Sequence, residues 1–578
     1  MGSKQTSQKG KRTTFWGMSF RTLILILVLM FALIAIYQMK VLTSLDPTGL
    51  RQVASAATCD FKGNDVSRLF NNMSNINKII VQHEFAGFRN ASRDELVGDL
   101  VPNIVYYVWC ENATFEFKHY LNVLSAWKIL QPDMIEFHYF GKIMLGPYNN
   151  WFNRLLRTIP SFHAIKAPSN WDGEEMGCDP WLGLALVDDR GGIYVSANTI
   201  IADSIFKYRK KDLTVILQGP NSTNEISILI GKSHNSRLDD SIDSLVRYYQ
   251  KLPQISNFCD YSGHNSPGHN TFACVTIPDS TMLYPEDYFT VNSSFGNLVR
   301  TLLYGNPAPR VPVKSPGAVP KVVHYIWFGS QNMTFMMYLS MLSTLYIVNP
   351  EKVYIHCDGY LHGTYYDKIL KDKRVVFVYR EKPGYIYTHR LLYSQHRSDI
   401  VRGDVLLKYG GIYLDWDVLW LRPIDDLIQS GYDAIANFDH MRHAQYPNTI
   451  NLGVFLAKPR SAFLKRWQDA LVDYKSDDFL YNAVLLPYKV YENLPETLYI
   501  VRRLQVMCFH LKCHPAFDPN FHDFSEAQEF DWRKDVYAIH FTFPDPHEYD
   551  NLTSLMKGKG MFADIGRYVL KCADKLLK

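Results

Sequence analysis

The longest apolar run of the chain lies near its N-terminus, where Thr22–Met39 contains 18 residues without a charge. At about 1.5 Å per helical residue, this run nearly spans a hydrocarbon core of about 30 Å. We expect a retained membrane anchor rather than a cleaved signal peptide, because the run is longer than an ordinary signal core. The small residues of Ala54–Ala56 lie too far downstream to serve as its cleavage site.

The charges that flank this run predict its orientation. Five basic residues and no acidic one precede it: Lys4, Lys9, Lys11, Arg12 and Arg21. Positive flanks stay in the cytosol, so we expect residues 1–21 to be cytosolic, 22–39 to span the membrane, and all that follows to be translocated. An anchor this short favours a thin membrane of the early secretory pathway.

Beyond the anchor, apolar runs of strand length alternate with stretches of helical pattern. Val322–Trp327 is β-branched and aromatic, as a buried strand would be, and Lys352–His356 and Arg374–Tyr379 have the same character. Ser398–Tyr409 is expected to be a helix that begins with Ser398 as its N-cap, and Ile412–Asp415 is expected to be the next strand. Such alternation predicts an α/β fold with a mostly parallel sheet and ligands at the ends of its strands.

An internal repeat divides the translocated part. Pro102–Trp109 recurs as Pro320–Trp327 after 218 residues, and the Gly-Gly-Ile-Tyr that ends Leu186–Tyr194 recurs at the end of Leu406–Tyr413 after 219. Two matches in the same order at nearly the same spacing indicate a duplicated domain. We therefore expect a stem at 40–100, a first domain at 101–304, a linker rich in Pro and Gly at 305–317, and a second domain at 318–578.

The positive net charge of the chain is concentrated near its N-terminus. The 578 residues carry a formal charge of +4, but six of the 61 basic residues precede residue 41. The rest of the chain therefore has two more acidic than basic residues. The excess of positive charge lies in the segments that flank the expected anchor and set its orientation. A nucleic acid is not expected as a partner.

Acceptor sites for N-glycosylation agree with a luminal location. Seven Asn-x-Ser/Thr sites occur where roughly three would arise by chance, and all follow the anchor. They are Asn72, Asn90, Asn112, Asn221, Asn292, Asn332 and Asn551. The lumen also permits disulfides, for which Cys508 with Cys513 and Cys259 with Cys274 are the plausible local pairs, although sequence does not fix the connectivity.

Two acidic residues close the strand that follows Gly410 and Gly411. Asp415 and Asp417 are two apart in a segment expected to be extended, so their carboxylates can emerge on one face. A solvated acidic strand end would fit poorly between apolar neighbours such as Trp416, because buried carboxylates are costly unless a cation joins them. The pair predicts a Mn²⁺ or Mg²⁺ site of the kind that neutralises a departing diphosphate.

The segment Ser398–Asp426, preceded by Pro320–Trp327, resembles the family-32 glycosyltransferases with a DXD sugar-binding region. These include α-1,6-mannosyltransferase-like enzymes and α-1,4-galactosyl- and α-1,4-N-acetylglucosaminyltransferases. The resemblance covers about 320–460 clearly and implies a GT-A fold. With the internal repeat and the apolar run, the expected fold is a duplicated GT-A fold behind an N-terminal transmembrane helix. It further implies a Golgi enzyme, retaining in its stereochemistry, that uses a UDP- or GDP-sugar donor and a glycan or glycolipid acceptor.

The resemblance also implies roles for individual residues. Those it places at the metal are Asp415, Asp417 and His540. Those it places at the donor nucleotide and sugar are Trp327, Asp399, Arg402, Asp415 and Asn451. Simple alternatives stand beside several of these roles: Trp327 and His540 are also ordinary core residues, Asp399 with Arg402 is also an exposed ion pair, and Asn451 also suits a turn.

The first domain lacks the acidic pair. Ser196 and Asn198 occupy the positions of Asp415 and Asp417, and Gly183 occupies that of Arg402. Neutral oxygens do not replace two anionic ligands, so this domain is expected not to be catalytic. The second domain carries the expected activity, metal-dependent transfer of a hexose or N-acetylhexosamine. The rival hypothesis is a non-catalytic luminal carbohydrate-binding or scaffolding protein in which both domains are degenerate.

Overall fold

The computed structural model describes residues 98–577, apart from gaps at 111–113, 146–150, 168–177, 218–225, 236–258, 261–272, 360, 440–447, 516, 519–529 and 543–545. The predicted cytosolic tail and anchor, and all but the end of the stem, lie outside these residues. In the part that is described, no helix combines the length and the apolar character that crossing a membrane requires.

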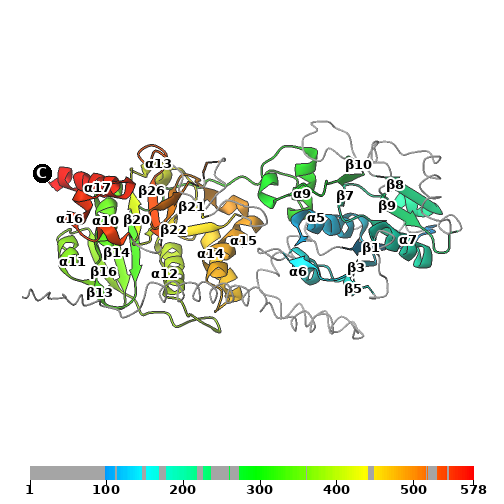
Figure 1. Ribbon diagram of the computed structural model, residues 1–578, viewed down its shortest axis with the longest axis horizontal. Coiled ribbons are helices and arrows are strands. Elements are labelled where there is room, and N and C mark those ends of the chain that lie inside the picture. Colours follow the sequence, from blue (N-terminus) through cyan, green and yellow to red (C-terminus); the bar gives the residue numbers. More distant parts are fainter. Residues whose placement is uncertain are drawn as a thin grey trace, which may run out of the picture. The chain divides into compact units, whose positions relative to one another are not determined.

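The second domain is built on a seven-stranded mixed sheet (Figure 1). Its order is β16 (Val375–Tyr379), β14 (Lys352–Cys357), β12 (Val322–Trp327), β19 (Gly411–Leu414), β22 (Ile450–Ala457), β21 (Ala434–Phe438) and β23 (Tyr499–Ile500). The first four of these strands run parallel, whereas β22 is antiparallel to both β19 and β21. The predicted α/β class is confirmed, and β12 has the bounds that its apolar run predicts.

Alternate residues of each central strand enter different cores. On β19, Ile412 and Leu414 pack on the side of α10 (Phe335–Ser343) and α17 (Met561–Leu577), while Tyr413 faces the opposite side. That opposite core is formed with α12 (Ser394–Tyr409), α14 (Ala462–Ala470) and α15 (Leu486–Asn493). This alternation is the period of two expected for a strand covered on both faces, and it gives a three-layered domain.

Helix α12 begins four residues before the predicted start. Its first turn is held by the buried His396, whose Nδ1 accepts a bond of 2.6 Å from the Tyr474 hydroxyl and whose Nε2 donates to the Phe479 carbonyl at 3.2 Å. Ser398 therefore lies inside the helix, where its hydroxyl donates to the carbonyl of Gln395 instead of capping. Tertiary contacts, not the capping signal, determine where this helix starts.

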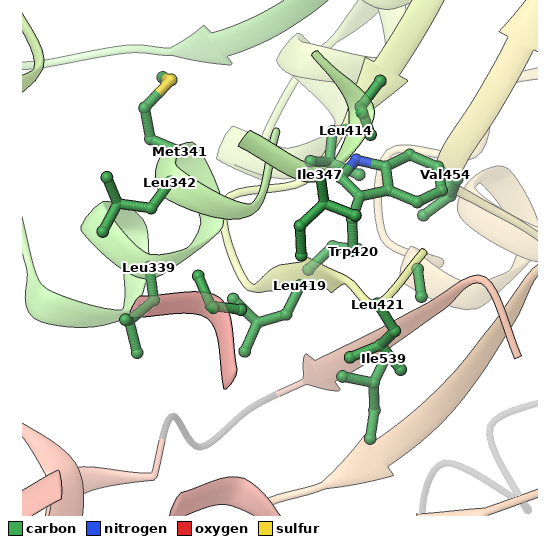
Figure 2. Packing of buried hydrophobic residues seen from close by; sticks show 14 of the residues in the cluster. Leu339, Met341, Leu342, Ile347, Leu414, Leu419, Trp420, Leu421, Val454 and Ile539 are labelled. Atoms are coloured by element: carbon green, nitrogen blue, oxygen red, sulfur yellow. The ribbon is translucent and has the colours of Figure 1, made fainter. Parts of the chain in front are cut away.

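A smaller sheet lies beside the end of β19. Its order is β20 (Val418–Trp420), β26 (Ala538–Thr542), β24 (Gln505–Phe509) and β25 (Lys512–His514). The predicted disulfide between Cys508 and Cys513 joins β24 to β25. Trp420 anchors the connection, because its fully buried ring extends from the small sheet toward Leu414 and Val454 of the main sheet (Figure 2).

The first domain repeats this plan. Its main sheet has the order β5 (Phe162–Lys166), β3 (Met134–Tyr139), β1 (Ile104–Trp109), β6 (Gly192–Val195), β9 (Ile226–Gly231) and β8 (Leu213–Leu217). Its small sheet has the order β10 (Cys259–Asp260), β11 (Cys274–Thr276) and β7 (Thr199–Ile201). Cys274 is disulfide-bonded and stands opposite Cys259 in the register of β10 and β11.

Candidate active site

Asp415 and Asp417 flank a tight turn between the two sheets of the second domain. Strand β19 ends at Leu414 and β20 begins at Val418, so the segment is not extended as the sequence pattern predicts. Trp416 points inward and donates from its indole nitrogen to the Ile326 carbonyl at 3.0 Å. With this ring buried between them, both carboxylates remain partly exposed at the carboxyl end of the main sheet.

His540 reaches the acidic turn from the small sheet. Strand β26 pairs antiparallel with β20, and this register sets His540 opposite Val418. The Nε2 atom of His540 lies 3.0 Å from Asp417 Oδ1 and 3.9 Å from Asp415 Oδ2. The structure thus brings together three residues that are up to 125 positions apart in the sequence.

The three side chains fit a divalent cation. One ligand atom from each lies within 4.8 Å of the others, and the buried Asp417 Oδ1 faces His540 Nε2. Two carboxylates with an imidazole form a donor set suited to Mn²⁺, whereas carboxylates and water suffice for Mg²⁺. Burial opposes the charge on His540, but the carboxylates of Asp417 and Asp415 outweigh burial and raise its pKa, so the site attracts positive charge.

Gly453 on β22 makes room for this arrangement. A Cβ atom at this position would lie 2.5 Å from His540 Cε1 and 2.6 Å from Asp415 Oδ2. Its backbone carbonyl accepts a hydrogen bond of 2.8 Å from the Asp415 amide. The glycine therefore permits β22 to approach both side chains more closely than any other residue could.

Arg402 and Asp399 lie on one face of α12, beside the acidic turn. Arg402 donates to the Leu452 carbonyl at 2.7 Å and to Asp415 Oδ1 at 3.3 Å, and its guanidinium stacks on the Tyr413 ring. Its Nη2 is 3.1 Å from Asp399 Oδ1. Burial raises the pKa of Asp399 to about 6 despite the nearby guanidinium. The pair is buried, which distinguishes it from an exposed ion pair on a helix surface.

A cleft of about 1150 Å³ opens over these residues and contains every residue that the sequence placed at the donor and the metal. Asn451 lies on its wall, and its Oδ1 accepts from the Gly453 amide at 2.7 Å. Trp327 lines the cleft from the end of β12 and also packs against the core. Its position therefore agrees both with a place at the donor nucleotide and with a core residue. Phe479 and Leu480 give the cleft an apolar side, on which Leu480 is 62% exposed.

The equivalent positions in the first domain carry no acid. The strand registers align Thr199 with Val418, so Ser196, Asn198 and Thr276 stand where the second domain has Asp415, Asp417 and His540. Lys118 replaces the cleft-lining Met336, and its ammonium donates to the Asp279 carbonyl at 2.7 Å. Three neutral side chains thus occupy the place of the acidic cluster.

Three further residues of the second-domain site were not predicted from the sequence. Tyr413 donates to Asp415 Oδ1 at 2.5 Å, and Gly453 provides the close approach described above. Gln505 on β24 bonds both His540 and Asn451. Only Gln505 stands out in retrospect, as a polar residue within an apolar strand, because such residues are buried only with partners.

Comparison with known proteins agrees with this site. The family described as "glycosyltransferase sugar-binding region containing DXD motif" matches residues 343–433. Glucan organizing enzyme 1 of Cryptococcus neoformans var. grubii is 24% identical over 237 residues, covering 39% of this chain. The match spans 64% of that relative, which is less than two thirds of its length.

Solved structures of glycosyltransferases also align with the chain. The galactosyltransferase LgtC is 13% identical, with 44% of this chain and 95% of LgtC covered at a TM-score of 0.27. The glycosyltransferase GlyE of Streptococcus pneumoniae is 10% identical, with 45% of this chain and 63% of GlyE covered at a TM-score of 0.28. Over residues 343–433 of the second domain, the chain is therefore similar to glycosyltransferases whose sugar-binding region contains a DXD motif.

Proposed function

We propose that the chain is a type II Golgi membrane glycosyltransferase that moves a hexose or N-acetylhexosamine from a UDP- or GDP-sugar to a glycan or glycolipid. The observation that carries this proposal is the convergence of Asp415, Asp417 and His540 at one end of the cleft. A mixed sheet with an acidic turn after its central strand supports a GT-A type of fold. The apolar run Thr22–Met39 and the Asn-x-Ser/Thr sites support the Golgi membrane location and N-glycosylation.

The residues of the site divide the work of transfer between them. Asp415, Asp417 and His540 would hold Mn²⁺ or Mg²⁺, which supplies charge neutralisation for the diphosphate leaving group. Arg402 is fixed by the Leu452 carbonyl and by two carboxylates, so its guanidinium is preorganised beside the phosphates without reordering. Asn451 keeps its Nδ2 hydrogens for a sugar hydroxyl, since its Oδ1 already accepts from Gly453 and Gln505.

The acceptor is expected to approach along the apolar side of the cleft. Phe479 and Leu480 stand there with the π-helical turn Tyr481–Leu485, of which Ala483, Val484 and Leu485 also line the cleft. Apolar surface that remains exposed in a cleft favours a ligand with an apolar part, which supports a glycolipid acceptor. We further propose that the anomeric configuration is retained, and product analysis by NMR would test this.

The decisive experiment replaces Asp417 with Asn. Asp417→Asn removes one anionic ligand with little change of shape, so metal-dependent transfer should fall by roughly 10²-fold or more while the melting temperature stays near that of the wild type. The readout is donor hydrolysis and transfer with a panel of UDP- and GDP-sugars, in Mn²⁺ and in EDTA. The matched control is Asp469→Asn, a partly exposed helix residue paired with Lys465, which should keep full activity.

The same assay separates the enzyme from the rival hypothesis of a carbohydrate-binding protein. A binding module would show no donor turnover with any nucleotide sugar, with or without metal. Full activity of Asp417→Asn would exclude the assigned site even if the chain is a transferase.

A further inference from the structure

Gln505 lies directly behind the predicted metal and sugar residues. It belongs to β24, is 3% exposed and lines no part of the cleft. Its side chain contacts His540 Nδ1 through Oε1 at 3.1 Å, and through Nε2 it reaches Asn437 Oδ1 at 2.7 Å and Asn451 Oδ1 at 3.1 Å. One buried amide thus joins the metal side of the site to the sugar side.

Backbone groups fix the direction of every bond in this network. Asn437 donates from Nδ2 to the Phe438 carbonyl at 2.8 Å, so its Oδ1 is the atom that accepts from Gln505. Asn451 Oδ1 accepts from the Gly453 amide at 2.7 Å, so it too presents an oxygen to Gln505. Both Nε2 hydrogens of Gln505 are therefore used, and its Oε1 must accept from His540.

Two consequences for the cleft follow from these directions. A neutral His540 carries its proton on Nδ1, so the lone pair of Nε2 faces Asp415 and Asp417. With Oδ1 of Asn451 occupied twice, the Nδ2 group of Asn451 is left as the donor toward the cleft. The opposite orientation of the Gln505 amide would reverse both outcomes.

We infer that Gln505 is a positioning residue that presents His540 Nε2 to the divalent cation and the Asn451 amide to the donor sugar. This inference rests on the proposed function, because it requires a cation at the acidic turn and a sugar nucleotide in the cleft. Gln505 touches neither ligand. It acts by fixing the tautomer of His540 and the amide orientation of Asn451.

Two substitutions separate the two roles. Gln505→Glu keeps an oxygen that can accept from His540 Nδ1, but it has no hydrogen to donate to Asn437 or Asn451. Gln505→Met is similar in size and loses both functions. Gln468→Met serves as the matched control, because Gln468 bonds the exposed Asp404 on the far side of α12 from the cleft.

The first measurement is binding of Mn²⁺ alone to the full-length chain, followed by electron paramagnetic resonance. Gln505→Met should bind Mn²⁺ about 10- to 100-fold more weakly, which is the usual effect of losing a partner of a metal-binding histidine. Gln505→Glu should stay within a few-fold of the wild type. The second measurement is the KM for the donor at saturating Mn²⁺, which should rise about tenfold in Gln505→Glu through the loss of the Asn451 orientation.

The outcomes are distinct for the inference and for the proposed function. Wild-type affinity for Mn²⁺ in Gln505→Met would overturn the inference and leave the proposed function standing. Equal weakening of Mn²⁺ binding in Gln505→Glu and Gln505→Met would also overturn it. If Gln505→Met does not fold, loss of Mn²⁺ binding in a folded Gln505→Glu is enough to overturn it. A wild-type chain that binds no Mn²⁺ would overturn the proposed metal site, and the role of Gln505 with it.

Discussion

At the scale of single residues, the site depends on the hydrogen atom that Gly453 has in place of a side chain. Gly453→Ala would push a methyl group against His540 and Asp415, neither of which can move far, since both are held by hydrogen bonds. We predict that Gly453→Ala weakens Mn²⁺ binding and transfer by about 10²-fold, because displacements of about 1 Å at a site have effects of that size. Mn²⁺ titration and initial rates with the donor would measure it.

The control for this prediction is Gly403→Ala in α12. A Cβ there would lie 3.0 to 3.4 Å from three atoms of one flexible, partly exposed side chain, that of Gln468, and alanine is the better helix residue by about 1 kcal/mol. Gly403→Ala should therefore keep activity and hold or raise the melting temperature. If Gly453→Ala behaved in the same way, the close packing at the acidic turn would have no functional meaning.

The residues of the site differ in how far the sequence could predict them. Asp415 and Asp417 are two positions apart in the sequence and form a recognisable motif, whereas His540 was expected only from the family resemblance. Gln505 acts through partners that lie 35 to 68 positions away in the sequence, and Gly453 contacts His540 across 87 positions. A single sequence contains no record of such contacts, so these roles required the structure.

At the scale of secondary-structure elements, strands β12 and β14 are joined by two buried histidines. His324 donates to the Gly410 carbonyl at 3.0 Å, so its other nitrogen accepts from His356 at 3.0 Å. Burial lowers the pKa of His324 to about 4 and that of His356 to about 3. Both rings are neutral in the folded domain at any pH at which an unfolded chain would begin to protonate them.

These histidines predict a pH dependence of stability. Below a pH of about 6.5 the two histidines bind protons in the unfolded chain but not in the folded domain. The free energy of unfolding that they contribute is therefore fully present above that pH and falls as the pH is lowered toward 4. Each histidine contributes up to about 1.4 kcal/mol per pH unit. His356→Gln keeps a donor for His324 and removes one titrating group, so the melting temperature should fall less steeply between pH 6.5 and 4.5.

Thermal denaturation across that range would measure the effect, with His547→Gln as the control because His547 is exposed. An unchanged slope in His356→Gln would show that the buried histidine pair is not what makes the domain sensitive to acid.

Elements were predicted best where local pattern and tertiary setting agree. The strand Val322–Trp327 has the predicted bounds because β-branched and aromatic residues suit a strand covered on both faces. The predicted start of α12 was wrong because contacts of His396 override the capping preference of Ser398. The acidic segment was expected to be extended, but burial of Trp416 turns the chain between two sheets.

At the scale of the whole molecule, the same order of strands occurs twice, but an acidic cluster occurs once in the described chain. Ser196, Asn198 and Thr276 provide no charge to bind a cation in the first domain. We therefore predict a stoichiometry of one Mn²⁺ per chain. A titration followed by electron paramagnetic resonance would measure it on the full-length protein.

Asp417→Asn is the control for this stoichiometry, since it should abolish the single site. Two bound ions per chain, or one ion that survives in Asp417→Asn, would place metal binding in the first domain or elsewhere.

The position of the acidic turn has a mechanical consequence. Asp415 follows a strand of the seven-stranded sheet, whereas His540 belongs to the four-stranded sheet. A cation shared by these residues would cross-link the two sheets reversibly, much as a disulfide does permanently, and would add its binding free energy to the cohesion of the domain. Loading and unloading of the ion would then change the stiffness of the scaffold on both sides of the cleft.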